Sequence, residues 1–403
     1  MTLMVGRQPI LDQHGVTYGY ELLYRGDGEH EFLKMSAEEV TSSVINSSFY
    51  ETEIGSLSSG KVSFINFTAK LIIDEIWRVL PKHRVVIEFL ESVEATPEII
   101  AAVKTMKAAD YRIALDDFVY REDLEPLIEL ADIIKVDIRD TDSATIASLA
   151  RRFLPKGKIL LAEKVETLQE FKTCRDLGYT LFQGYFFARP SLMPTTSRQD
   201  SKASKLRLMQ KIHDPDVDYG EVVEILKADP NLSLKLLKYI NSVAMGVRHE
   251  ITSLRMALAL IGLMNFKKWA SVLIMASFSD GKPMELLRLT LIRGRLCELL
   301  SEAMGKSDHS SEYFLVGIFS LLDATLDKPM DVLVKDLPLA DDIIETLLGH
   351  ETRYQQILSI AYILESNIEI GTKLNEIGCK LDETTVAQIN QSAIIWSDEI
   401  IKL

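Results

Sequence analysis

Two adjacent carboxylates, Asp116 and Asp117, follow the short apolar run at residues 113–115. Such a run is typical of a buried parallel strand, so the pair lies where that strand ends and the chain turns into a loop. Adjacent aspartates repel each other, and burying them without compensation would cost several kcal/mol. A divalent cation removes this repulsion, which makes the pair a candidate ligand site. An isolated pair would rather be a solvated turn, so this interpretation depends on the rest of the chain.

Other polar side chains recur at or near the carboxyl ends of strand-like runs. The full set is Glu21, Asn66, Glu88, Asp116, Lys135, Glu163 and Gln183. In a barrel of parallel strands these ends converge on one mouth, where catalytic residues lie. Each residue alone could cap a strand, but seven at equivalent places indicate a common site. Dense oxygen ligands suit hard cations such as Mg²⁺, Mn²⁺ or Ca²⁺, whereas the seven histidines include no metal-spaced pair and so disfavour zinc.

The strands that must position these residues alternate with amphipathic stretches over the first half of the chain. A hairpin is expected from residues 4–7 and 17–23, which flank a turn-rich segment, and a helix from residues 37–49. Further strands are expected at residues 62–67, 85–90, 113–115, 133–136, 159–162 and 180–183, with helices at 70–79, 97–108, 124–130, 143–153 and 168–177. About eight strands in so short a stretch favour a compact α/β TIM-like barrel over an open doubly wound sheet.

The pattern changes after Pro190, where residues 191–204 are polar and turn-prone. We place the barrel domain at residues 1–195, a linker at 196–204 and a second domain at 205–403. In that second domain apolar residues recur at three- and four-residue steps, which predicts helices. These are expected at residues 206–212, 221–228, 232–244, 254–264, 266–277, 284–304, 312–324 and 343–366. The second domain should therefore be an all-α helical bundle.

Composition narrows the classes of function. The 403 residues are 47% apolar and 26% charged, typical of a soluble globular protein with two or three domains. No apolar run approaches the roughly 18 residues that span a bilayer, and the N-terminus lacks a signal-peptide pattern. We therefore expect a cytoplasmic protein without membrane attachment. The net charge of −14 disfavours nonspecific nucleic-acid binding, and three separated cysteines fit reduced thiols.

Seven segments of the first half resemble, in order, the motifs of the EAL domain family. They are Glu21-Leu-Leu-Tyr-Arg25, Ile65-Asn66-Phe67-Thr68, Glu88-Phe-Leu-Glu91, Asp116-Asp117-Phe118, Lys135-Val-Asp137, Ala162-Glu-Lys-Val-Glu166 and Gln183-Gly-Tyr-Phe-Phe187. The resemblance covers about residues 1–195. It implies a TIM-like barrel that hydrolyses the bacterial messenger cyclic di-GMP to the linear dinucleotide pGpG, using Mg²⁺ or Mn²⁺.

The same resemblance implies a role for each site residue. One metal ion would be held by Glu21, Asn66, Glu88 and Asp116. A second ion would lie near Asp116, Asp117 and Glu163. The catalytic set would be Lys135, Glu21 and Glu163, with Lys135 orienting the attacking water. The ligand would be bound by Gln8, Gln183 and Arg25, with Arg25 gripping a phosphate. Two supporting residues would be Glu91, which braces the loop after Asp117, and Glu166. Two metal ions can clamp the attacking and leaving oxygens of a phosphodiester displacement.

The signature Glu-Ala-Leu is Glu21-Leu22-Leu23 here, an apolar change that should be tolerable, and two further segments depart from the family pattern. The loop after Asp-Asp-Phe, built from small residues in the family, is Val-Tyr-Arg-Glu-Asp-Leu at residues 119–124, and the Gly of Ala-Glu-Gly-Val-Glu is Lys164. In active members that loop helps to set the second metal and pairs subunits, so a homodimer is also open. The ligand set favours a phosphodiesterase, whereas the departures favour a cyclic di-GMP receptor without useful turnover. A scaffold for an apolar partner would leave the carboxylate-rich mouth unexplained.

The second half resembles the HDOD domain. The resemblance is carried by Asp229-Pro-Asn-Leu-Ser233, Lys238-Tyr-Ile-Asn-Ser242 and residues 251–262. HDOD domains are helical relatives of HD-type metallohydrolases and are generally considered non-catalytic signalling modules. Where a hydrolase carries His-Asp, this chain has Leu322-Asp323, so Asp323 is expected to be structural. The resemblance implies a regulatory or output domain that acts through a protein partner, which the sequence does not identify.

Overall fold

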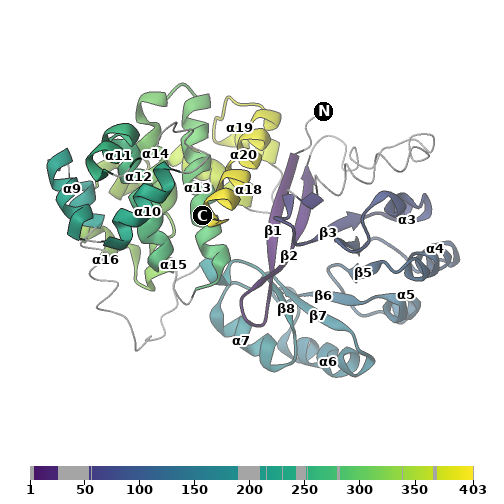
Figure 1. Cartoon of the computed structure of the whole chain (residues 1–403). Helices are drawn as coiled ribbons and strands as arrows, with labels where there is room; N and C mark the ends of the chain where they lie inside the picture. The colour runs from purple at the N-terminus through teal and green to yellow at the C-terminus, as the bar shows by residue number, and fades with distance from the viewer. Residues whose placement is uncertain are drawn as a thin grey trace.

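The chain forms a closed β-barrel followed by a helical domain, and Figure 1 shows the two side by side with the β1–β2 hairpin between them. The computed structural model describes residues 4–25, 54–55, 57–188, 209–214, 216–228, 230–241, 251, 253–278, 282–337, 339–365 and 370–402. The helix expected at residues 37–49 and the linker expected at 196–204 lie outside these ranges. The domain boundaries therefore stay a prediction.

Eight strands close the barrel in chain order. They are β1 (Met4–Asp12), β2 (Thr17–Arg25), β3 (Val62–Phe67), β4 (Val85–Phe89), β5 (Arg112–Leu115), β6 (Ile133–Asp137), β7 (Ile159–Glu163) and β8 (Leu181–Gln183). Strands β2 to β8 pair with one another in parallel, whereas β1 is antiparallel to both β2 and β8. The predicted TIM-like barrel is confirmed, with its first strand inverted because β1 and β2 form the expected hairpin.

A layer of apolar side chains fills the barrel interior and fixes which residues face its mouth. The layer is made of Ile10, Phe64, Val86, Ala114, Ile133, Leu161 and Leu181. Side chains alternate along a strand, so residues two positions farther on point the same way. On β3 to β8 those residues are Asn66, Glu88, Asp116, Lys135, Glu163 and Gln183. The site residues thus form the next interior layer, at the carboxyl ends of the strands.

The helices that surround the barrel follow the predicted pattern with one exception. They are α3 (Ala69–Ile73), α4 (Pro97–Ala108), α5 (Glu125–Leu130), α6 (Ser143–Phe153) and α7 (Leu168–Asp176). The single helix expected at residues 70–79 is wrong, because Glu75 has a left-handed φ of 54° that ends α3 before the short 3₁₀ helix η2 (Ile76–Val79). A left-handed residue interrupts the helical hydrogen bonds.

The second domain is helical, as predicted. Its described helices are α9 (Tyr219–Ala228), α10 (Pro230–Ile240), α11 (Leu254–Ile261), α12 (Leu263–Phe278), α13 (Met284–Ala303), α14 (Ser310–Phe319), α15 (Leu322–Leu326), α16 (Met330–Leu333), α17 (Asp341–Leu347), α18 (Gln355–Glu365), α19 (Ile370–Glu376) and α20 (Glu383–Lys402). The single helices expected at residues 312–324 and 343–366 are each divided in two. In the second case Gly349, with a φ of 89°, follows α17.

The break between α11 and α12 limits the length of both helices. Gly262, with a φ of 78°, ends α11 one residue before α12 begins, whereas the sequence pattern placed this break at residue 265. Within the described residues no single helix has both the length and the apolar composition of a membrane span. Helices α11 and α12 would meet that test only together, and they are bent by 106° relative to each other.

The helical domain packs against the outer face of the barrel. Leu286 and Leu289 of α13 belong to the same buried apolar cluster as the outward-facing residues of the barrel strands. The hydroxyl of Tyr20, on β2, donates a 2.8 Å hydrogen bond to the Glu285 carboxylate of α13, and both residues are buried. Because Tyr20 directly precedes Glu21, this contact supports the backbone of a strand that carries a site residue.

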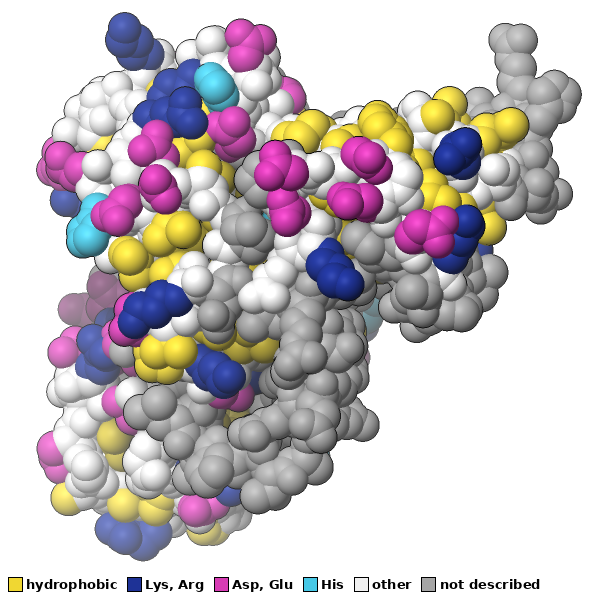
Figure 2. Space-filling view, turned by 90° about the vertical axis from the view of Figure 1, so that its left-hand side faces the viewer, with side chains coloured by type: hydrophobic (Ala, Val, Ile, Leu, Met, Phe, Trp, Pro, Cys, Tyr) yellow, Lys and Arg dark blue, Asp and Glu magenta, His cyan; other side chains and the backbone are white. Residues whose placement is uncertain are grey.

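The surface carries charge of both signs. On the face shown in Figure 2, basic side chains lie among acidic ones, and apolar side chains are visible between them. The pattern on that face is one of interspersed charges rather than a continuous basic surface among the residues coloured there.

Candidate active site at the barrel mouth

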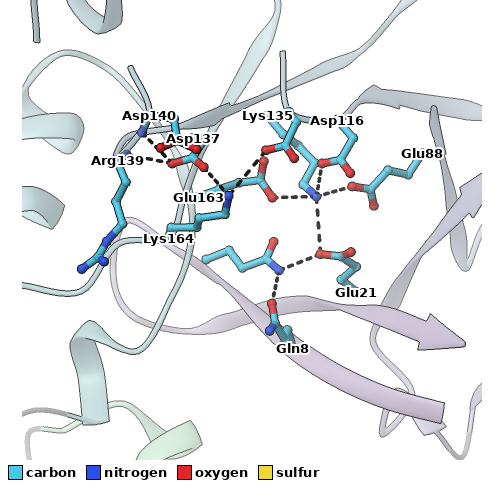
Figure 3. Close-up of polar contacts among 12 residues, drawn as sticks. Gln8, Glu21, Glu88, Asp116, Lys135, Asp137, Arg139, Asp140, Glu163 and Lys164 are labelled. Atoms are coloured by element: carbon cyan, nitrogen blue, oxygen red, sulfur yellow. Dashed lines mark hydrogen bonds and ion pairs between the residues drawn. The ribbon is translucent and has the colours of Figure 1, made fainter. Parts of the chain in front are cut away.

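A buried ammonium group lies at the centre of the barrel mouth (Figure 3). The side chain of Lys135 is only 1% exposed, and its Nζ lies 2.8 Å from Asp116, 2.8 Å from Glu163 and 3.4 Å from Glu21. It also contacts Glu88. Four carboxylates around one ammonium leave an excess of three negative charges when all are ionised. A buried excess of this kind is unfavourable without a further cation.

The electrostatics of the cluster follow from burial and crowding. Burial, with the neighbouring carboxylates Asp116 and Glu21, raises the pKa of Glu163 to about 8, although Lys135 opposes this shift. Burial likewise raises the pKa of Glu88 well above its usual value. Burial lowers the pKa of Lys135, but the surrounding carboxylates outweigh it and raise that pKa well above its usual value. Lys135 therefore keeps its proton at neutral pH.

Several buried oxygen atoms at the mouth have no hydrogen-bond donor among the described residues. They are Oδ1 of Asn66, Oε2 of Glu88, Oε2 of Glu163 and Oε1 of Gln183. Leaving a buried acceptor unpaired costs roughly 1–3 kcal/mol, so each atom requires a partner that the described residues do not supply. Carboxylate and amide oxygens are the ligands that Mg²⁺ and Mn²⁺ prefer. This donor set therefore fits a divalent cation.

A second group of carboxylates lies at the edge of this cluster. Ligand atoms of Asp116, Asp117 and Glu163 all lie within 4.8 Å of one another. Asp117 has a φ of 38°, an unusual backbone conformation for a residue other than glycine. This turn lets neighbouring aspartates face the same mouth, as their position at the end of β5 predicted.

Amide side chains line the β1–β2–β8 side of the mouth. Gln183 donates to Glu21 at 2.6 Å and to Gln8 at 2.7 Å, and Asn66 donates to Glu21 at 3.5 Å. Gln8 lies opposite Glu21 in the β1–β2 register. The structure thus brings all of these predicted site residues to one place and aligns the Glu21 carboxylate by amide donors.

The remaining predicted residues lie farther out. Arg25 ends β2, but its side chain lies outside what the structure describes, so its role stays a prediction. Glu91 is exposed and makes no hydrogen bond or ion pair with another described residue, and its bracing role also stays a prediction. Glu166 forms an ion pair with Arg139 in the loop after β6. In the loop that departs from the family pattern, the Tyr120 ring stacks against the Arg152 guanidinium, 3.7 Å away.

The sequence analysis gave no role to Asp137, which the structure places beside the site. Asp137 is buried, accepts hydrogen bonds from the backbone N–H groups of Arg139 and Asp140, and contacts the Lys164 ammonium. Burial raises its pKa, but these donors outweigh burial and hold the pKa below its usual value. Its position two residues after Lys135, on the same face of β6, was the available signal.

Comparison with known proteins identifies the family. The EAL domain model matches residues 7–190, and the HDOD domain model matches residues 202–322. The uncharacterized protein YuxH of Bacillus subtilis is 32% identical over 412 residues, which cover 100% of this chain and 99% of YuxH. Cyclic di-GMP phosphodiesterase CdgJ of Vibrio cholerae is 32% identical over 405 residues, covering 100% of this chain and 94% of CdgJ. The chain belongs to the family of proteins that join an EAL domain to an HDOD domain.

Solved structures of EAL proteins are also similar to part of the chain. A standalone EAL protein from Vibrio cholerae, in its c-di-GMP bound form, is 23% identical with a TM-score of 0.35, covering 47% of this chain and 92% of that one. The manganese/cy-diGMP complex of BlrP1 from Klebsiella pneumoniae is 25% identical with a TM-score of 0.36, covering 46% of this chain and 55% of that one.

Proposed function

We propose that the barrel binds cyclic di-GMP and hydrolyses it to pGpG with the help of Mg²⁺ or Mn²⁺. The observation that carries this proposal is the buried carboxylate cluster around Lys135 together with its unpaired oxygen atoms. Membership of the EAL-HDOD family supports it, as does the similarity to CdgJ, whose name describes a cyclic di-GMP phosphodiesterase. In this proposal the protein acts in the cytoplasm, and the helical domain regulates the barrel or transmits its state to a protein partner.

The residues that would hold the cation are those with buried, unpaired oxygen atoms and their neighbours. One ion would be held by Glu21, Asn66, Glu88 and Asp116, and Asp117 and Glu163 would face a second position. When bound, a divalent cation polarises phosphate oxygens and lowers the pKa of water. The Glu21 carboxylate is already oriented for this role, because Gln183 and Asn66 donate to it.

Lys135 acts as a fixed positive charge rather than as a base. Its raised pKa keeps the ammonium protonated, so it can donate hydrogen bonds but cannot accept a proton. Once a cation engages the carboxylates, the ammonium would be available to orient a water molecule and to stabilise charge that develops on the phosphate. Gln8, Gln183 and Arg25 would bind the nucleotide, with Arg25 placed on a phosphate.

A second function, a cyclic di-GMP receptor with little turnover, is favoured by one specific observation. The Lys164 ammonium contacts Asp137 and lies 4.0 Å from Asp117, beside the position where a second ion would bind. The altered loop at residues 119–124 adjoins the same position and leaves Val119 72% exposed. A receptor would bind the nucleotide and change the contact between the domains without releasing pGpG.

One experiment separates the two functions. The purified full-length protein would be incubated with cyclic di-GMP and Mn²⁺ or Mg²⁺, with pGpG followed by chromatography and nucleotide binding followed by calorimetry. Formation of pGpG that stops with a chelator supports the phosphodiesterase. Binding without pGpG supports the receptor, and neither binding nor cleavage refutes both. Size-exclusion chromatography with light scattering, with and without nucleotide, would measure whether the protein is a monomer or a homodimer.

The helical domain is proposed to carry no hydrolase chemistry. Leu322, where a hydrolase would place a ligand histidine, is fully buried in the apolar core. Asp323 accepts a hydrogen bond from the Ala324 backbone N–H at the start of α15, which is a structural role. Metal-dependent phosphatase activity that survives loss of the barrel site through Glu88→Gln would contradict this proposal.

A further inference from the structure

Lys164 places a positive charge at the edge of the carboxylate cluster. Its side chain is 50% exposed, contacts the buried Asp137 carboxylate, and has its Nζ 4.0 Å from Oδ1 of Asp117. Figure 3 shows the side chain reaching from the end of β7 across to the Asp137 loop. Asp117 also belongs to the group of three carboxylates whose ligand atoms lie within 4.8 Å of one another. The ammonium therefore lies beside that group and offsets part of its negative charge.

The backbone at this residue shows why a lysine here is unexpected. Lys164 has a φ of 56°, in the left-handed region that glycine adopts without cost and other residues rarely adopt. The side chain is nevertheless held over the mouth by Asp137, whose other contacts come from the backbone N–H groups of Arg139 and Asp140. The strained residue and its buried anchor together keep one positive charge beside Asp117.

Around Lys135 the cluster keeps buried oxygen atoms that no described donor pairs. Glu163 is 7% exposed, and its Oε2 has no hydrogen-bond donor among the described residues. Glu88 is fully buried and has an unpaired Oε2 as well. Lys164 makes no ion pair with Glu21 or Glu88 within the part of the chain that the structure describes. Its ion pairs are with Asp137 and Asp117, and the unpaired oxygens of Glu88 and Glu163 remain available to a cation.

We propose that the Lys164 ammonium takes the place of a second divalent cation, so that the mouth binds one ion tightly and a second ion only weakly. The inference depends on the cation site of the proposed function and specifies its stoichiometry. A cation of charge +2 and an ammonium about 5 Å apart repel each other even in water, enough to weaken binding by about tenfold. The proposal also gives a physical reason for low turnover by any mechanism that needs two ions.

The test is a titration of the full-length protein with Mn²⁺ alone, by calorimetry and by electron paramagnetic resonance of free Mn²⁺. Wild type should bind one ion tightly and a second ion at least about tenfold more weakly. Lys164→Met and Lys164→Gly should both bind the second ion at least about tenfold more tightly than wild type. Lys164→Arg, which keeps the charge, should behave as wild type does. Lys156→Met is a matched control, because Lys156 is 44% exposed and pairs with Glu125.

Each other outcome decides against the inference. Two Mn²⁺ ions bound with equal affinity by wild type would overturn it, and so would an affinity for the second ion that is the same in wild type and Lys164→Met. Either result would leave the proposed function intact. A gain in Lys164→Gly but not in Lys164→Met would assign the effect to backbone strain and would also overturn it. No Mn²⁺ binding in any of these proteins would refute the cation site and hence the proposed function as well. Circular dichroism of each variant would establish that it is folded.

Discussion

Replacing Lys135 with methionine should destabilise the metal-free protein strongly, and Mn²⁺ should largely reverse that loss. Methionine nearly fills the volume of the lysine stem but removes the single ammonium that contacts Glu21, Glu88, Asp116 and Glu163. The variant therefore leaves four buried or half-buried carboxylates without that charge. A divalent cation would supply it again.

The size of the effect follows from burial. Lys135 is 1% exposed, and Glu88 is 0% exposed, so solvent screens their attraction little. Removing one partner of a buried ion pair typically costs about 3–5 kcal/mol. Some carboxylates will take up protons instead of remaining charged, so we expect about 3 kcal/mol at pH 7.5 and less at pH 5. Ligand binding to the folded state alone contributes about 2.7 kcal/mol at a concentration 100 times the dissociation constant.

The assay is urea unfolding of metal-free protein, followed by far-UV circular dichroism and by fluorescence, to which the buried barrel residue Trp77 contributes. Lys107→Met is the control, because Lys107 pairs with Asp132 at a site where their side chains are 29% and 34% exposed. That variant should lose at most about 1 kcal/mol and should gain nothing from Mn²⁺. A loss below about 1 kcal/mol in Lys135→Met, or equal effects of Mn²⁺ on both variants, would refute this reasoning.

Three further predictions concern the same site and its support. The raised folded-state pKa of Glu163, about 8, contributes stability that is present at low pH and lost as the pH rises. The free energy of unfolding of metal-free protein, measured by urea titration, should therefore fall between pH 5 and 8 by up to about 1.4 kcal/mol per pH unit. The slope should be smaller in Glu163→Gln. A free energy that rises over this pH range would contradict the prediction. Tyr20→Phe should lower the free energy of unfolding by about 1.5–3 kcal/mol, because it removes a buried hydrogen bond to the charged Glu285. Tyr18→Phe is the control and should cost less, because the Tyr18 hydroxyl is only partly buried where it accepts a hydrogen bond from Arg112. Equal losses in the two variants would count against the role of the domain contact. Glu21→Gln should weaken Mn²⁺ binding in calorimetry by at least about tenfold while the protein stays folded, since it removes a charged ligand; unchanged affinity would remove Glu21 from the ligand set.

Much of the barrel could be predicted because strand periodicity and the site coincide. Phe64 and Asn66, or Leu161 and Glu163, share a face of one strand, so an apolar interior residue followed two positions later by a polar one indicated both the fold and the mouth. The antiparallel placement of β1 followed from the turn between residues 12 and 15.

Other features depend on contacts that local pattern does not contain. The helix breaks at Glu75 and at Gly349 result from positive φ angles. The apolar side-chain pattern continues through both positions, so it did not indicate the breaks. The contact between Tyr20 and Glu285 joins residues 265 positions apart, so sequence spacing carried no sign of it. The anchoring of Lys164 by Asp137 likewise links the ends of two strands. The sequence identified Lys164 as a departure from the family, but only the structure shows what its ammonium contacts.

The proposed hydrolysis and the proposed role of Lys164 both depend on a divalent cation bound by the oxygen atoms around Lys135. Diffraction from crystals soaked in Mn²⁺, collected at the manganese absorption edge, measures that directly. We predict an anomalous peak among Glu21, Asn66, Glu88 and Asp116 that is lost in crystals of Glu88→Gln. A fully ordered barrel mouth with no anomalous peak there, at a Mn²⁺ concentration that saturates binding in solution, would contradict the account.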